Sequence, residues 1–152
     1  MDNRLLSQES VDTTGSNPAG LTDLELKIVR KQAELFEVSM DIEPTEDYIE
    51  SLKLDIADIQ QNLDELSDKY YRWKSGIFTV DDGSKTAEEK IEIKNSIMKS
   101  LSVAILKRSR ESYQVKKNLS VAESNLTIMK TEVRVLELHL KRLLEADYDM
   151  NS

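Results

Sequence analysis

The sequence is poor in the residues that most folds and most active sites require. Its 152 residues include no cysteine, one histidine, four glycines and two prolines. The lack of cysteine excludes disulfides, thiolate metal sites and cysteine nucleophiles. Glycine and proline are too scarce for a β-sandwich or barrel, which needs a turn signal about every 8–12 residues. Long apolar runs are also missing, so we expect no segment to span a membrane.

Charged residues are abundant, at 33% of the chain, and they give a net charge of −8. A negative chain repels phosphate groups, and we therefore do not expect nucleic acid to be the main partner. The length suits a single domain. The first residues show no secretory signal pattern, which makes a reducing compartment, the cytoplasm or the nucleus, the expected location.

Two short motifs predict where helices begin. Thr22 with Glu25, and Thr86 with Glu89, have the spacing of a capping box. In this motif each side chain accepts a hydrogen bond from the backbone N–H of the other residue, which satisfies donors that the first helical turn leaves unpaired. Helices should therefore start at about residues 22 and 86.

Gly76 is placed to end the first helix, because glycine adopts the left-handed conformation after a helix without strain. The sequence thus predicts a helix over about 22–75, a loop over 76–85 and a second helix over about 86–146. Residues 1–20 are polar and aperiodic, which predicts a disordered tail.

Apolar residues in both predicted helices recur with heptad spacing. The a positions follow every seven residues from Leu21 and Ile91, and the d positions follow from Leu24 and Lys94. Sixteen of 18 positions in the first series are apolar, as are 13 of 16 in the second. Such a repeat is typical of a coiled coil. We therefore predict an all-α fold, an elongated antiparallel helical hairpin with helices about 80 and 90 Å long.

Pro44 lies inside the first heptad series. Proline removes one helix hydrogen bond and clashes with the preceding turn. Because the heptad phase is the same on both sides, we expect the first helix to be kinked or broken near Pro44.

Charge favours folding back over parallel pairing with a second chain. The first helix carries a net charge of −7 and the second +3, so self-pairing of the first would set like charges together. One allowed register pairs residues whose numbers sum to 157. It places the acidic stretch 40–58 opposite the basic stretch 99–117, and Thr45 opposite Ser112. We predict that register.

Apolar residues outside the heptad positions predict where a partner binds. They form one stripe on the first helix and one on the second, at the end of the hairpin remote from the loop: Leu26, Val29, Phe36 and Met40, then Ile128, Val135 and Leu138. Exposed apolar patches of this size mark interaction sites. The alternative is that Leu5 and Leu6 of the tail fold back and cover part of the surface.

The loop supplies a second candidate contact through Ile77, Phe78 and Val80. The interpretation we favour is that these residues cap the end of the hairpin, with Ile77 in contact with the last helical turn. The alternative is an exposed docking tip.

Nothing in the sequence predicts catalysis, a metal site or a cofactor. His139 stands alone at a surface heptad position, whereas catalysis or metal binding needs partners within reach. A basic cluster, Lys107 to Arg110, is expected to face the acidic stretch of the first helix. Phosphorylation of Ser109 or Ser112 would add negative charge opposite Glu46 and loosen the hairpin.

These observations favour a non-enzymatic coiled-coil scaffold or adaptor, a structural subunit of a multiprotein complex. Its expected partners are one or more helical protein subunits, with a heteromeric complex favoured. Three alternatives remain: a homodimeric coiled-coil scaffold, a holdase chaperone of the prefoldin type, and a weak nucleic-acid or membrane-surface binder acting through residues 99–117.

Overall fold

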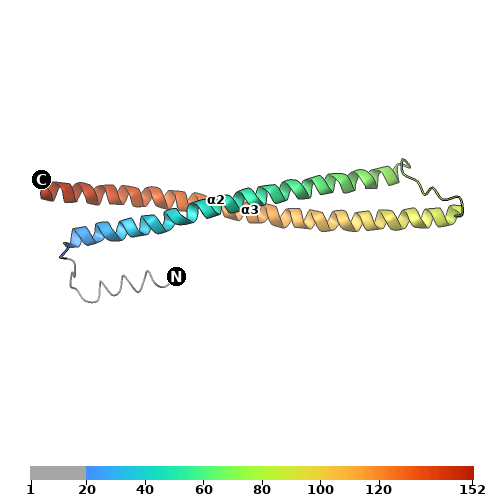
Figure 1. Cartoon of the computed structure of the whole chain (residues 1–152). Helices are drawn as coiled ribbons and strands as arrows, with labels where there is room; N and C mark the ends of the chain where they lie inside the picture. Colours follow the sequence, from blue (N-terminus) through green and yellow to red (C-terminus); the bar gives the residue numbers. More distant parts are fainter. Residues whose placement is uncertain (1–19) are drawn as a thin grey trace. The chain divides into compact units, whose positions relative to one another are not determined.

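A computed structural model describes residues 20–152, and over these residues the fold is all-α. Helix α2 (Asp23–Lys74) has 52 residues and helix α3 (Ala87–Asn151) has 65, and a connection of twelve residues joins them (Figure 1). The two helices pack against each other. The tail predicted over residues 1–20 lies, except for Gly20, outside the described residues.

Both helices begin where the capping boxes predict. The Thr22 N–H donates to Glu25 Oε1 at 2.8 Å, and the Glu25 N–H donates to Thr22 Oγ1 at 3.1 Å. The Thr86 and Glu89 pair repeats this reciprocal arrangement at 2.9 and 3.1 Å. Each box satisfies two backbone donors of the first turn, which explains why each helix starts one residue after the threonine of its box.

Gly76 ends α2 as predicted, with a φ of +82° two residues after Lys74. The end of α3 differs from the prediction, because this helix continues past residue 146 to Asn151. The Asn151 side-chain amide donates to the Asp147 backbone carbonyl at 2.8 Å, which satisfies one of the carbonyls exposed in the last turn.

The positive φ makes Gly76 sensitive to substitution. We expect Gly76→Ala to lower the free energy of unfolding by about 1 kcal/mol, because a Cβ is unfavourable in left-handed backbone. No atom lies within 4 Å of the added Cβ, so the cost comes from backbone strain alone. Gly83→Ala is the matched control, because Gly83 has equal space and no positive φ. Equal urea midpoints for the two variants would contradict this account.

Helix α2 continues through Pro44 without interruption, so the predicted break is wrong. Pro44 is exposed. The helix loses one hydrogen bond there and keeps its regular conformation on both sides, where the same heptad series is buried. A kink at this residue stays a prediction.

The described chain divides into two compact units, each containing a segment of both helices. Unit 1 comprises the described residues up to Pro44 together with Thr127–Ser152, and unit 2 comprises Thr45–Leu126. The predicted docking stripes lie in unit 1. The connection and the basic stretch 99–117 lie in unit 2.

The heptad series correctly predicts which residues are covered. Within α2 every a and d residue is buried or half-buried, and within α3 the same is true of all but Ile91. The core of unit 2 shows how these residues meet. Ile49 and Leu52 of α2 pack with Ala122 of α3. Three half-buried residues surround this cluster: Val115, Leu119 and Leu126.

The register predicted from charge is wrong by two heptads. Arg108 Nε donates to Asn62 Oδ1 at 2.7 Å, and Ile49 packs in the cluster with Ala122, so facing residues have numbers that sum to about 171 rather than 157. Thr45 and Ser112 are therefore not in one layer.

The observed register gives Arg108, a charged residue at a heptad position, polar surroundings. In the predicted register Arg108 faces Ile49, which would desolvate a guanidinium against an aliphatic side chain. In the structure Arg108 instead bonds Asn62 and pairs with Glu111. Charge is still complementary, because residues 54–72, which now face 99–117, contain five acidic and two basic side chains.

Candidate functional site

The α2 stripe, comprising Leu26, Val29, Phe36 and Met40, is largely uncovered. Phe36 is 64% exposed, and Val29 and Met40 are also exposed, whereas Leu26 is half-buried. A phenylalanine this exposed is costly in water, since burying such a side chain is worth about 1.5–3 kcal/mol. The stripe is therefore a surface that gains free energy when it is covered.

The α3 stripe, comprising Ile128, Val135 and Leu138, is exposed throughout. Val121 of unit 2, seven residues before Ile128 in the sequence, is exposed as well. Both predicted stripes thus exist as apolar surface.

The two stripes lie on different sides of unit 1. Val29 and Phe36 each follow an a residue by one position. Ile128 and Val135 each precede a d residue by one position. A helix turns about 100° per residue, so a residue next to a heptad position lies just outside the contact between the helices. Val29 and Phe36 therefore lie on the outer side of the a residues, here called the a side. Ile128 and Val135 lie on the outer side of the d residues, here called the d side. In an antiparallel pair these sides border different grooves, so one helix cannot cover both stripes.

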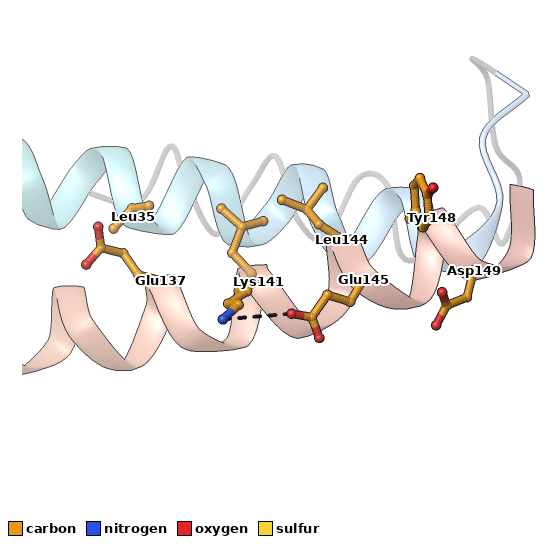
Figure 2. A pocket seen from close by; sticks show the side chains of 8 residues that line it. Leu35, Glu137, Lys141, Leu144, Glu145, Tyr148 and Asp149 are labelled. Atoms are coloured by element: carbon orange, nitrogen blue, oxygen red, sulfur yellow. Dashed lines mark ion pairs between the residues drawn. The ribbon is translucent and has the colours of Figure 1, made fainter. Parts of the chain in front are cut away.

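On the a side lies an apolar groove of about 480 Å³, here named the terminal groove. Leu35 of α2 and Leu140 of α3 are its heptad residues. Figure 2 shows Leu35 on one helix and the remaining labelled residues on the other, with Lys141 Nζ 3.9 Å from Glu145 Oε1. Its other lining residues all come from α3: Glu137, Lys141, Leu144, Glu145, Tyr148 and Asp149.

On the d side lies a second groove of similar volume, here named the basic groove. Its lining combines five residues that can carry positive charge with one carboxylate and one leucine: Lys27, Arg30, Lys31, His139, Arg142, Glu34 and Leu143. Lys31 Nζ lies 3.3 Å from Glu34 Oε2. The sequence reasoning missed this groove, because it compared charges over long windows and not over the residues beside the d positions.

The loop residues have unequal roles. Phe78 packs edge-to-face on Trp73, with ring centroids 5.9 Å apart, and the Arg72 guanidinium lies 5.6 Å from the Phe78 ring centroid. The Phe78 N–H also donates to the Arg72 carbonyl at 2.9 Å. Val80 is half-buried, whereas Ile77 is exposed. The residue that covers the last turn of α2 is therefore Phe78 and not Ile77.

A tight turn precedes α3. The Ser84 hydroxyl and the Ser84 backbone N–H both donate to Asp82 Oδ1, at 2.6 and 2.9 Å. These bonds stabilise the carboxylate and lower the pKa of Asp82 below its usual value. Asp82 is fully exposed, and its role is to shape the connection.

Side chains with potential chemistry are scattered. Within residues 20–152 no three histidine or acidic side chains gather as a metal ion requires. His139 is exposed and lines the basic groove. Ser109 is exposed and Ser112 is buried between the helices, so only Ser109 is accessible to a kinase in the folded protein. The observed register also removes Glu46 from the level of either serine.

Neither helix of the described region holds a stretch long and apolar enough to cross a bilayer. Comparison with protein-family models, with curated proteins and with solved structures finds no match for this chain.

Proposed function

We propose that the protein is a non-enzymatic structural or adaptor subunit that docks a helical partner on the a side of unit 1. The observation that carries this proposal is the exposed α2 stripe beside the terminal groove. Phe36 and Val29 are exposed on the a side of α2, and the exposed residues Leu144 and Tyr148 of α3 line the terminal groove on the same side. The stripe and the groove therefore present apolar side chains on one side of unit 1.

The spacing along this surface suits a helix. Val29 and Phe36 are seven residues apart and Met40 follows four residues later, which is the interval at which a facing helix presents its own apolar residues. A third helix lying along the terminal groove would cover these side chains and extend the two-stranded coiled coil that we propose for α2 and α3. We favour a heteromeric partner.

Charge at the groove restricts the partner further. The acidic side chains of Glu137, Glu145 and Asp149 outnumber the one lysine in the lining, Lys141. A partner helix with basic residues beside its apolar face would complement this rim, and such complementarity selects partners more than it adds affinity.

The test compares two exposed apolar residues in different units. The full chain is purified under native conditions from its host as the wild type, as Phe36→Glu and as the control Leu54→Glu. We expect a stoichiometric partner with wild type and control, and its loss with Phe36→Glu. Leu54 is exposed to a similar degree, at 68% against 64%, but lies in unit 2.

Crosslinking of the wild-type complex locates the contact. Lys141 lines the terminal groove, so partner crosslinks are expected there. Unchanged recovery with Phe36→Glu, or crosslinks confined to residues 45–126, would contradict the proposal. Circular dichroism of each purified variant shows that the helices are retained.

A further inference from the structure

The d side of unit 1 carries charge of both signs in two separate sections. The section nearer the start of α2 is basic and the other is acidic. The basic section contains Lys27, Arg30 and Arg142, and the acidic section contains Glu37, Asp41 and Glu132. All six are exposed or half-buried. Each of them lies either one residue before a d residue or three residues after one. Both kinds of position are on the d side, the side on which Ile128 and Val135 lie.

The two sections share one centre on each helix. On α3, Arg142 and Glu132 are ten residues apart, with their midpoint at residue 137. On α2, Lys27 and Asp41 are 14 residues apart and Arg30 and Glu37 seven, and both midpoints lie close to residue 34. Glu34 and His139 line the same groove, so residues 34 and 137 lie at about the same level.

Val135 lies near this centre on the d side and is exposed. Leu138 is exposed too, but it comes five residues after the a residue Val133 and faces away from α2. The surface therefore has Val135 near its middle, beside Glu34 and His139 of the basic groove, with positive charge toward one end and negative charge toward the other. Such a surface is complementary to itself when it is turned end over end.

We propose that the d side of unit 1 binds a second copy of this chain about a two-fold axis that crosses the helices near residues 34 and 137. Each α3 then lies antiparallel to the α3 of the partner copy, with Val135 of both copies near the axis. Arg142 of each copy comes to the level of Glu132 of the other. On α2, Lys27 likewise comes to the level of Asp41 of the other copy, and Arg30 to the level of Glu37. This is an isologous contact, in which each pair occurs twice.

This dimer is separate from the proposed docking function, because it leaves the terminal groove and the α2 stripe open. The apolar centre is small and exposed ion pairs are individually weak. The association is therefore of the weak, transient class that small interfaces support, and it is to be measured over a concentration series.

Charge exchange tests the pairing. The full chain is studied by sedimentation equilibrium as the wild type, as Arg142→Glu and as the double variant Arg142→Glu/Glu132→Arg. The single change creates two like-charge contacts across the axis and should raise the dimer dissociation constant at least about tenfold. The double variant exchanges the charges of each pair, so its dimer dissociation constant should return to within about threefold of the wild-type value.

An apolar pair of variants tests the centre. Val135→Ser should weaken the dimer, whereas Val103→Ser should leave it unchanged, because Val103 is similarly exposed (60% against 46%) but lies in unit 2.

A monomer at all concentrations overturns the proposal. Insensitivity to both Val135→Ser and Arg142→Glu also overturns it, as does a dimer lost with Phe36→Glu.

Discussion

Replacing Leu52 by alanine is expected to lower the free energy of unfolding of unit 2 by about 2–4 kcal/mol. The cost combines lost apolar burial with the cavity that remains. Leu52 is 5% exposed and packs with Ile49 and Ala122 in the cluster at the centre of this unit. A two-helix core has few other buried residues to compensate, so this is the most damaging conservative change we expect. The measurement is urea denaturation followed by circular dichroism at the helix band.

Leu54→Ala is the matched control for Leu52→Ala. The two leucines are two positions apart in the same helix, but Leu54 is 68% exposed. Since leucine and alanine have similar helix propensity, Leu54→Ala should change the unfolding free energy by less than about 0.5 kcal/mol. Equal losses for both variants would mean that the two helices do not pack as described.

Replacing Pro44 by alanine is expected to raise the free energy of unfolding by about 2 kcal/mol. Proline inside a helix costs roughly 3 kcal/mol relative to alanine, through the missing N–H and the clash with the preceding turn. Proline also restricts the unfolded chain, which offsets about 0.4–1 kcal/mol of that cost. Pro44 is exposed, so the substitution leaves no cavity. The gain should appear as a higher urea midpoint.

Glu43→Ala is the control, because Glu43 is the exposed neighbour of Pro44 and its backbone is unaffected by the change. We expect its midpoint to stay within the range of ordinary surface substitutions, about 0.5 kcal/mol. A destabilised Pro44→Ala would contradict the account, and would show that the interruption at Pro44 is needed by the fold.

Helix starts and the covered face of each helix were predictable because both depend on residues close together in the chain. A capping box joins residues three apart, and the two hydrogen bonds of each of the two boxes are present as expected. A heptad repeat depends only on spacing along one helix. The positive φ of Gly76 follows likewise from a local rule about glycine after a helix.

The register was predicted wrongly because it depends on residues far apart, and registers that differ by one heptad bury similar apolar residues. We predicted the register from the net charges of long facing stretches, yet exposed ion pairs contribute little free energy. A single polar contact was more decisive. Arg108 occupies a heptad position, and in the observed register Asn62 of the facing helix accepts a hydrogen bond from its Nε.

The residues proposed for docking show the same division. Composition and spacing correctly indicated that Phe36 and Val135 are apolar and outside the helix contact, and both are exposed. Which of them share a surface depends on which side of the helix pair each one faces. The basic groove was missed for the same reason, since Lys27 and Arg142 are 115 positions apart in the sequence and line one groove.

By itself the sequence determined that the described chain is helical, where each helix starts, and which face of each is covered. These properties follow from hydrogen bonds and apolar spacing within a few turns. Only the tertiary structure decided the register, the continuity of α2 through Pro44 and the separation of the two stripes onto different grooves. Alternative pairings of two long helices bury nearly the same apolar area, so a few polar contacts between distant residues choose among them.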